Sequence, residues 1–146
     1  MEIRKLTISD YDALYDLWIH TPGMGLYSID DSRQGIAKYL AKNPDTCFGA
    51  VENGKLIGAI LAGNDGRRGY FSHTAVAAES QRKGIGTKLV EAVLASFRKL
   101  GITKVALLAF SRNEKGNAFW EKMGFHERTD LVYRDFTIAE MTHLDT

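Results

Sequence analysis

The sequence contains little of what disulfide cross-links, membrane spans or secretion require. Its 146 residues include one cysteine, Cys47, and two prolines. A single cysteine excludes an internal disulfide and fits a reducing compartment. No apolar run approaches the roughly 20 residues of a membrane-spanning helix, and the N-terminus lacks the apolar core of a signal peptide. We therefore expect a soluble, cytoplasmic protein, with Cys47 in its core rather than serving as a nucleophile.

An excess of either charge is also absent. Lysine and arginine together number 19 and aspartate and glutamate 18, for a formal net charge of +1. Such a balance offers no broad basic face for nucleic acid, and no feature predicts a membrane partner. The hydrophobic share of 45% is ordinary for a globular protein. The length is typical of one domain, here residues 1–146.

The first half of the chain predicts two helices and a strand meander. Residues 1–7 read as a short strand, and helical periodicity follows from about Ser9 and again from about Ser32. Residues 46–52 and 55–62 are apolar runs joined by Asn53-Gly54, the strongest short hairpin signal. A third strand over residues 70–77 completes an antiparallel meander.

The second half predicts alternating helices and strands. Residues 83–100 form the clearest helix, with Gly101 as its stop. Residues 103–110 form a continuous apolar run, as expected for a strand buried on both faces. A short helix over 114–123 and closing strands over 125–127 and 131–136 follow. The fold class expected is a single-domain α/β structure with a mixed, mostly antiparallel twisted sheet and helices on both faces.

The segment from Val76 to Leu89 is the most informative part of the sequence. A strand ends there, a loop containing Gly84 and Gly86 follows, and a long helix begins. Helix N-termini present unpaired N–H groups and a positive dipole end, so this arrangement can hold a pyrophosphate. The alternative is that the glycines only permit tight packing of strand and helix. A P-loop motif is absent, and Leu89 stands where a dinucleotide fingerprint needs a small residue.

Two motifs make the chain resemble a known family. Gln81-Arg82-Lys83-Gly84-Ile85-Gly86 resembles the Q/R-x-x-G-x-G/A motif of the GNAT superfamily of N-acetyltransferases, and Thr74-Ala75-Val76 resembles the end of that family's central strand. Residues 113–125 resemble its second conserved block, through Asn113, Ala118, Phe119, Trp120, Glu121, Gly124 and Phe125. The element order matches along essentially the whole chain. The resemblance implies a GNAT-like fold, with acetyl-CoA as co-substrate and no metal.

The resemblance also implies roles for individual residues. Backbone N–H groups would hold the pyrophosphate at Gln81, Arg82, Lys83, Gly84, Ile85, Gly86 and Thr87. Val76 would offer backbone groups to the pantetheine arm and to the oxyanion. Asn113 would contact the cofactor from the next strand–helix corner, and Trp120 would pack near the cofactor arm.

The implied reaction is direct attack of a primary amine on the thioester in a ternary complex, with a small molecule or a peptide as the acceptor. An amine near pKa 10 is nearly all ammonium at pH 7, so a base must accept its proton. His73 is the best candidate by residue type, although it fits equally well as a packed strand histidine. Simple alternation puts His73 on the opposite face from Val76, and a β-bulge would change that facing. Glu79 is a second candidate base.

Trp120 departs from the family pattern, because many members carry there a tyrosine that protonates the leaving thiolate. Indole has no useful acidity. Tyr133 or Tyr70 would have to substitute, or the thiolate would leave unprotonated. The missing tyrosine also keeps open an alternative function, a non-catalytic module that binds or senses acyl-CoA. A homodimer is left open as well.

The acceptor is expected between the loop of residues 21–31 and the strand ends. Tyr27, Asp30 and Asp31 lie in this loop, and its acidic residues would attract a cationic amine. The alternative is a solvated loop in which Asp30 or Asp31 caps the second helix.

Overall fold

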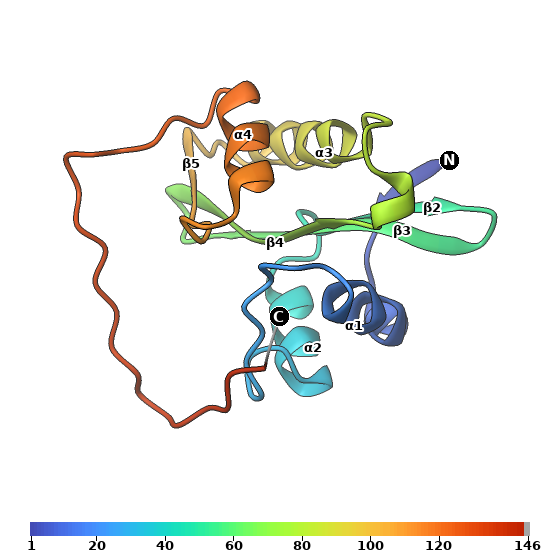
Figure 1. Ribbon diagram of the computed structural model, residues 1–146, viewed down its shortest axis with the longest axis horizontal. Coiled ribbons are helices and arrows are strands. Elements are labelled where there is room, and N and C mark those ends of the chain that lie inside the picture. The colour runs from blue at the N-terminus through green and yellow to red at the C-terminus, as the bar shows by residue number, and fades with distance from the viewer. Residues whose placement is uncertain (145–146) are drawn as a thin grey trace.

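In the computed structural model, which describes residues 1–144, five strands form one sheet between two layers of helices (Figure 1). The strands are β1 (Glu2–Lys5), β2 (Phe48–Glu52), β3 (Lys55–Asn64), β4 (Arg68–Val76) and β5 (Lys104–Leu107). The α-helices are α1 (Tyr11–Ile19), α2 (Arg33–Lys42), α3 (Ile85–Lys99) and α4 (Glu114–Lys122), with single 3-10 turns η1 (Ile8–Asp10) and η2 (Ala78–Ser80). The strands lie in chain order across the sheet and are antiparallel, except that β5 runs parallel to β4. The expected fold class is confirmed.

Local signals in the sequence set most of the turns and helix ends. Asn53 and Gly54 both have positive φ, 52° and 75°, as a two-residue turn between β2 and β3 requires. Gly101 ends α3 with φ at 75°. The Ser32 side chain accepts a hydrogen bond from the Gly35 N–H at 3.0 Å and so caps α2. The expectation that Asp30 or Asp31 caps this helix is therefore wrong, which leaves the Asp31 carboxylate for another contact.

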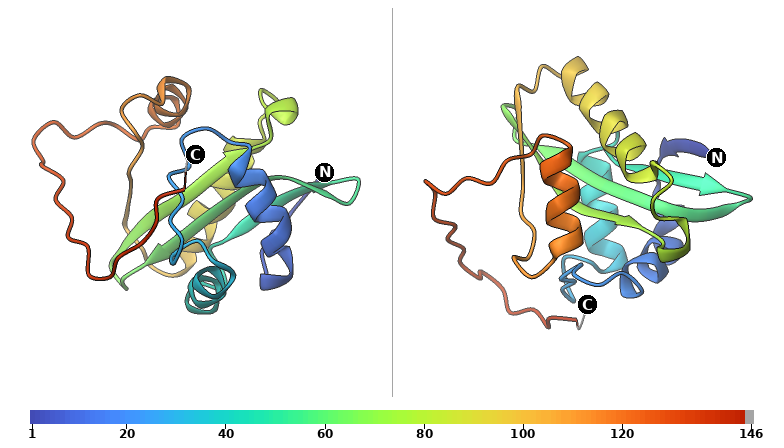
Figure 2. Two further views of the ribbon diagram at one scale, coloured as in Figure 1. Left: turned by 60° about the horizontal axis from the view of Figure 1, so that its bottom comes forward. Right: turned by 45° about the horizontal axis from the view of Figure 1, so that its top comes forward.

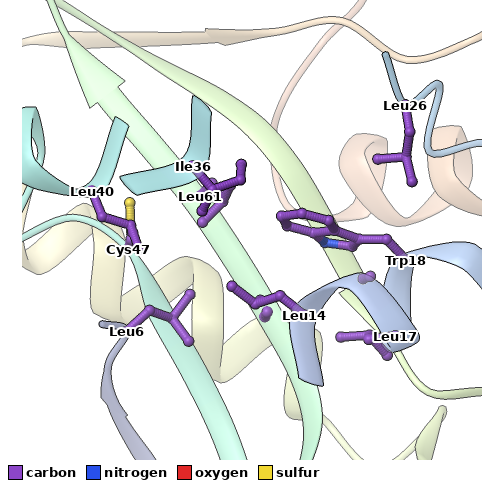
Figure 3. Close-up of a cluster of buried hydrophobic side chains, with 11 residues drawn as sticks. Leu6, Leu14, Leu17, Trp18, Leu26, Ile36, Leu40, Cys47 and Leu61 are labelled. Carbon is purple, nitrogen blue, oxygen red and sulfur yellow. The ribbon is translucent and has the colours of Figure 1, made fainter. Parts of the chain in front are cut away.

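Helices α1 and α2 cover one face of the sheet. Leu14, Leu17 and Trp18 of α1 pack with Ile36 and Leu40 of α2 against the sheet (Figure 3). Cys47 belongs to the same cluster and is 1% exposed. Burial raises the pKa of its thiol to about 11. Cys47 is thus a core residue, as expected.

Helix α3 and helix α4 cover the other face. Ile85, Leu89, Val93 and Phe97 repeat every four residues along α3, and all four are buried against the sheet. Gly69 of β4 lies directly beneath Phe97, where a Cβ would come within 2.5 Å of the ring. Strand β4 can therefore pass under α3 only with glycine at this position.

A β-bulge in β4 changes which residues of the strand lie on each face of the sheet. Ile60 of β3 pairs with Thr74 and Ala62 pairs with Phe71, so two residues of β4 lie opposite one residue of β3. Phe71 consequently faces α3, while Ala75 faces α1. The intervening His73 lies against Trp18 of α1, with their ring centroids 4.9 Å apart. The bulge thus places an imidazole on the face that carries α1 and α2.

The C-terminal part of the chain differs from the expectation. Residues 125–127 and 131–136 form no strands, and residues 126–141 run as an extended arm that stands away from the body in every view (Figure 2). Strand β5 is also shorter than the expected 103–110, and its side chains are alternately exposed and half-buried. The arm does not pair with β5, so β5 is an edge strand of the sheet. Its alternating exposure also shows that it is not the strand buried on both faces that the sequence predicted.

Candidate active site

The loop between β4 and α3 leaves the N-terminus of α3 open to solvent. Gly84 caps the helix in a left-handed conformation with φ at 78°, and an added Cβ there would meet nothing within 4 Å. Arg82 also has a positive φ of 66°, and non-glycine residues in this region are held there only by their surroundings. The N–H groups of Ile85, Gly86 and Thr87 in the first helical turn have no partner within the helix. Together with the exposed Arg82, Lys83 and Lys88, they form a positive site suited to a phosphate group.

An opening between β4 and β5 lies beside this helix terminus. The two strands pair only between residues 68–71 and 104–107, so the second half of β4 has no neighbour on that side within residues 1–144. The Ala77 N–H donates to the Ile57 carbonyl at 2.8 Å. Because the hydrogen-bonding direction alternates along an antiparallel strand, the Val76 peptide groups point away from β3 and into the opening. The Val76 carbonyl there accepts a hydrogen bond from the Gln81 side chain at 3.0 Å.

Helix α4 meets the same opening through Phe119. A Cβ on Gly86 would lie 3.2 Å from the Phe119 ring and 3.8 Å from Val76, so these three residues converge. The Asn113 side chain accepts from the Gly116 N–H and caps α4. It also lies against Gly23 of the loop between α1 and α2. Sequence reasoning missed Phe119 as a lining residue, although its place beside Trp120 in the second motif was the available signal.

His73 forms a buried pair with Asp31 on the face of the sheet that carries α1 and α2. Nε2 of His73 lies 2.7 Å from Oδ1 of Asp31, and the two side chains are 13% and 7% exposed. The second carboxylate oxygen of Asp31 accepts from the Tyr27 N–H at 2.7 Å. An ionised carboxylate only accepts hydrogen bonds, so Nε2 carries the proton and the lone pair of His73 lies on Nδ1. The carboxylate thereby sets both the orientation and the tautomer of the imidazole.

Asp31 also lines a surface pocket of about 290 Å³. Its lining is Tyr11, Tyr15, Tyr27, Ser28, Asp31, Ser32 and Leu144. The rings of Tyr11 and Tyr15 stack with centroids 6.0 Å apart, and the Tyr11 hydroxyl donates to the Asp31 carbonyl at 2.7 Å. Aromatic faces attract cations, and one of these faces already holds one, because the Arg33 guanidinium lies 5.0 Å from the centroid of the Tyr11 ring.

Three of the residues singled out from the sequence lie elsewhere. Glu79 is exposed on η2, where a hydrogen bond to its own backbone N–H and an ion pair with Lys55 lower its pKa. Trp120 is half-buried and packs against Phe71 and Phe125 at the margin of the core cluster beneath α3, whereas Phe119 meets the loop at Gly86. Tyr133 is 64% exposed on the arm. It lies close enough to Tyr70, near the other end of β4, to raise the pKa of that phenol, although burial of Tyr70 is the larger cause.

Within residues 1–144, no three His, Cys, Asp or Glu side chains are arranged to hold a metal ion. In the same part of the chain, no helix combines the length and the apolar composition that crossing a bilayer requires.

Comparison with known proteins bears on the same segments. The model of the acetyltransferase (GNAT) family matches residues 11–125. An acetyltransferase of Pectobacterium atrosepticum is 26% identical over 132 residues, which cover 90% of this chain and 92% of that protein. The crystal structure of Ard1 from Thermoplasma volcanium superposes with a TM-score of 0.75 at 20% identity, over 84% of this chain and 80% of that one. The PaiA N-acetyltransferase from Thermoplasma acidophilum, in complex with coenzyme A, gives 0.73 at 24% identity, over 84% and 87%.

Proposed function

The chain belongs to the acetyltransferase (GNAT) family and is an acetyl-CoA-dependent acyltransferase, and from that premise we propose that its acceptor is a cationic primary amine activated by His73. The observation that carries the proposal is the buried pair of His73 and Asp31, because His73 lies on the strand that ends at the Val76 opening. The His73 imidazole and the Val76 peptide lie three residues apart on β4, or about 10 Å at ordinary strand spacing. The acceptor amine fills part of this distance, and one water molecule that relays the proton fills the rest.

The donor binds at the opening between β4 and β5. The N–H groups of the first turn of α3 hold the pyrophosphate, with Arg82 and Lys83 contributing positive charge. The open space at Gly84 supports this assignment, because a phosphate can approach the backbone there without meeting a side chain. The Val76 peptide groups receive the pantetheine arm and the thioester carbonyl once the Gln81 amide turns away from the Val76 carbonyl.

The transfer then needs one proton acceptor and one oxyanion donor. The ammonium form of the acceptor gives a proton, through water, to Nδ1 of His73. The free amine attacks the thioester carbon, and the oxygen that becomes negative is stabilised by the Val76 N–H. The carbon–sulfur bond breaks, and the coenzyme A thiolate departs while the amide nitrogen loses its second proton to solvent. A thiol with a pKa near 8.5 leaves tolerably without a protein acid, so Trp120 in place of tyrosine does not prevent turnover.

The tyrosine-lined pocket indicates the class of acceptor. Tyr11, Tyr15 and Tyr27 line this pocket together with Asp31, whose carboxylate also meets His73. A small molecule or a peptide with a positive charge near the reacting amine fits this arrangement.

A cytoplasmic location remains a prediction from the sequence.

A thiol-release assay with acetyl-CoA and a panel of amines tests the proposal. The panel contains polyamines, amino acids, aminoglycosides and peptide N-termini. We expect turnover with cationic amines, a His73→Gln variant that loses at least 100-fold in kcat, and a Tyr15→Leu variant that mainly raises KM for the amine. Tyr15 is chosen because the hydrogen bonds that hold Asp31 come from Tyr11, Tyr27 and His73. Tight binding of acetyl-CoA without turnover on any amine would instead support the alternative function, an acyl-CoA sensor.

A further inference from the structure

Trp18 of α1 carries a buried N–H group for which the protein supplies no acceptor. The side chain is completely buried. Within residues 1–144, its indole Nε1 is the only fully buried side-chain nitrogen or oxygen without a hydrogen-bond partner. Figure 3 shows the ring among the apolar side chains of Leu14, Leu17 and Leu26, which cannot accept a hydrogen bond. An unpaired buried N–H destabilises a fold, and in native proteins such groups usually bond to an ordered water.

The Trp18 ring lies against the imidazole of His73, the proposed base. The two ring centroids are 4.9 Å apart, and the ring planes meet at 67°. Asp31 engages Nε2 of His73 at 2.7 Å, so the lone pair of the imidazole lies on Nδ1. Among residues 1–144, Nδ1 has no protein partner either, but it is not fully buried and therefore contacts solvent. The contact thus brings together an unpaired donor and an unpaired acceptor beside solvent.

We propose that one water molecule joins these two groups, accepting from the indole N–H of Trp18 and donating to Nδ1 of His73. This inference rests on the proposed function, in which a water relays the proton of the acceptor amine to His73. The second lone pair of the water faces the ammonium group of the acceptor. Two fixed protein groups give the water one orientation, which favours proton transfer. Trp18 is therefore a positioning residue that acts through the water and does not touch the amine.

The proton transfer through this water is balanced. The ammonium group gives one proton to the water oxygen while the water gives one of its own protons to Nδ1 of His73. The products are the free amine, a water and an imidazolium, whose positive charge Asp31 stabilises at Nε2. The indole of Trp18 only donates a hydrogen bond, because it has no useful acidity. Removing its N–H should therefore slow proton transfer and leave acetyl-CoA binding unchanged.

Removal of the N–H with retention of the ring tests the kinetic consequence. Trp18→Phe deletes the donor. Replacing Trp18 with benzothienylalanine exchanges the N–H for sulfur and keeps the bicyclic shape, so it leaves no cavity in the core. In both proteins we expect kcat with a cationic amine to fall about tenfold and the ascending limb of the pH–rate profile to flatten, while KM for acetyl-CoA stays the same. The matched control is Trp120→Phe, which changes the other tryptophan of the chain, on the opposite side of the sheet, and should keep the wild-type rate and profile.

NMR on the wild-type protein tests the water independently of activity. Isotope-labelled tryptophan gives two indole N–H signals, and Trp120→Phe assigns them. We expect a cross-relaxation peak between the Trp18 indole proton and a long-lived water. The absence of this peak, or a wild-type rate in the benzothienylalanine protein, would overturn the inference and leave His73 as the base. A His73→Gln protein with the wild-type rate would instead remove the proposed function, and the relay with it.

Discussion

Replacing Asp31 with asparagine isolates the function of the His73 pair, because the substitution keeps the shape of the side chain and removes its charge. In the wild-type protein, the Tyr27 N–H donates to Oδ2 of Asp31 at 2.7 Å. The asparagine oxygen can accept the same hydrogen bond. The NH2 group then faces Nε2 of His73, where the wild-type protein has an accepting oxygen at 2.7 Å. A donor at this position requires Nε2 to accept, so the proton moves to Nδ1. The lone pair that serves as the base is then turned away from the acceptor.

The magnitude of the loss follows from the contribution of a positioned general base, which is typically 100-fold or more. We expect kcat of Asp31→Asn to fall about 100-fold, equivalent to about 2.7 kcal/mol of transition-state stabilisation. The affinity for acetyl-CoA should stay the same, because Asp31 lies on the α1 and α2 side of the sheet and not beside the α3 terminus. The free energy of unfolding should fall by about 1 kcal/mol, as neutral hydrogen bonds replace charge-assisted ones.

The assay combines thiol release across pH, acetyl-CoA titration and thermal melting. The ascending limb of the pH–rate profile should flatten in Asp31→Asn. Asp30→Asn is the matched control, since it removes the same charge from the adjacent, exposed residue. A folded Asp31→Asn protein that retains the wild-type rate and pH profile would refute the reasoning and make His73 a structural residue.

Three further predictions address the donor site, α4 and the N-terminal ion pair. Lys83→Glu should raise KM for acetyl-CoA about tenfold, and by less at high salt, whereas Lys99→Glu at the other end of α3 should leave KM unchanged. Equal effects of the two substitutions in steady-state kinetics would exclude a phosphate site at the start of α3. Trp120→Phe should keep most activity, while Trp120→Ala should lower the unfolding free energy by less than the ~3–5 kcal/mol of a fully buried ring, because Trp120 is half-buried; a normally melting but inactive Trp120→Phe would show that the indole N–H takes part. A hydrogen bond from Arg4 is the main cause that lowers the pKa of Asp10, so its stabilisation is present above the unfolded pKa near 4 and lost as pH falls through the folded value. Asp10→Asn should therefore cost about 1 kcal/mol in urea unfolding at pH 7 and progressively less below pH 4; a pH-independent difference would contradict this account.

Local chemistry in the sequence was enough to predict most of the fold. The Asn53-Gly54 turn, the four-residue spacing along α3 and the stops at Gly101 and Gly124 act within a few residues of chain, so their effects can be read directly from the sequence. The loop of Gln81 to Gly86 was found for the same reason. The strand, the glycines and the helix are consecutive in the chain, so the phosphate site expected from them needs no residue from elsewhere in the sequence.

The pairing of His73 with Asp31 could not be predicted, because 42 residues separate them and two tertiary features bring them together. Helix α1 covers the face of β4 that carries His73, opposite to Val76 as simple alternation predicts, and Ser32 rather than Asp31 caps α2, which leaves the carboxylate free to meet the imidazole. The position of Tyr133 and the loss of the closing strands were equally hidden. The composition of residues 131–136 favours a strand. Whether the segment pairs with the edge of a sheet depends on the path of the whole chain.

The sequence by itself therefore determined the order of the elements, the anion-binding loop and membership of the family, since each rests on residues close together along the chain. Only the tertiary structure decided which imidazole and carboxylate share a buried site, that Phe119 and not Trp120 lines the opening, and that β5 is left as an edge. These depend on strand register and on packing across the sheet, where a shift of one residue moves a side chain to the opposite face.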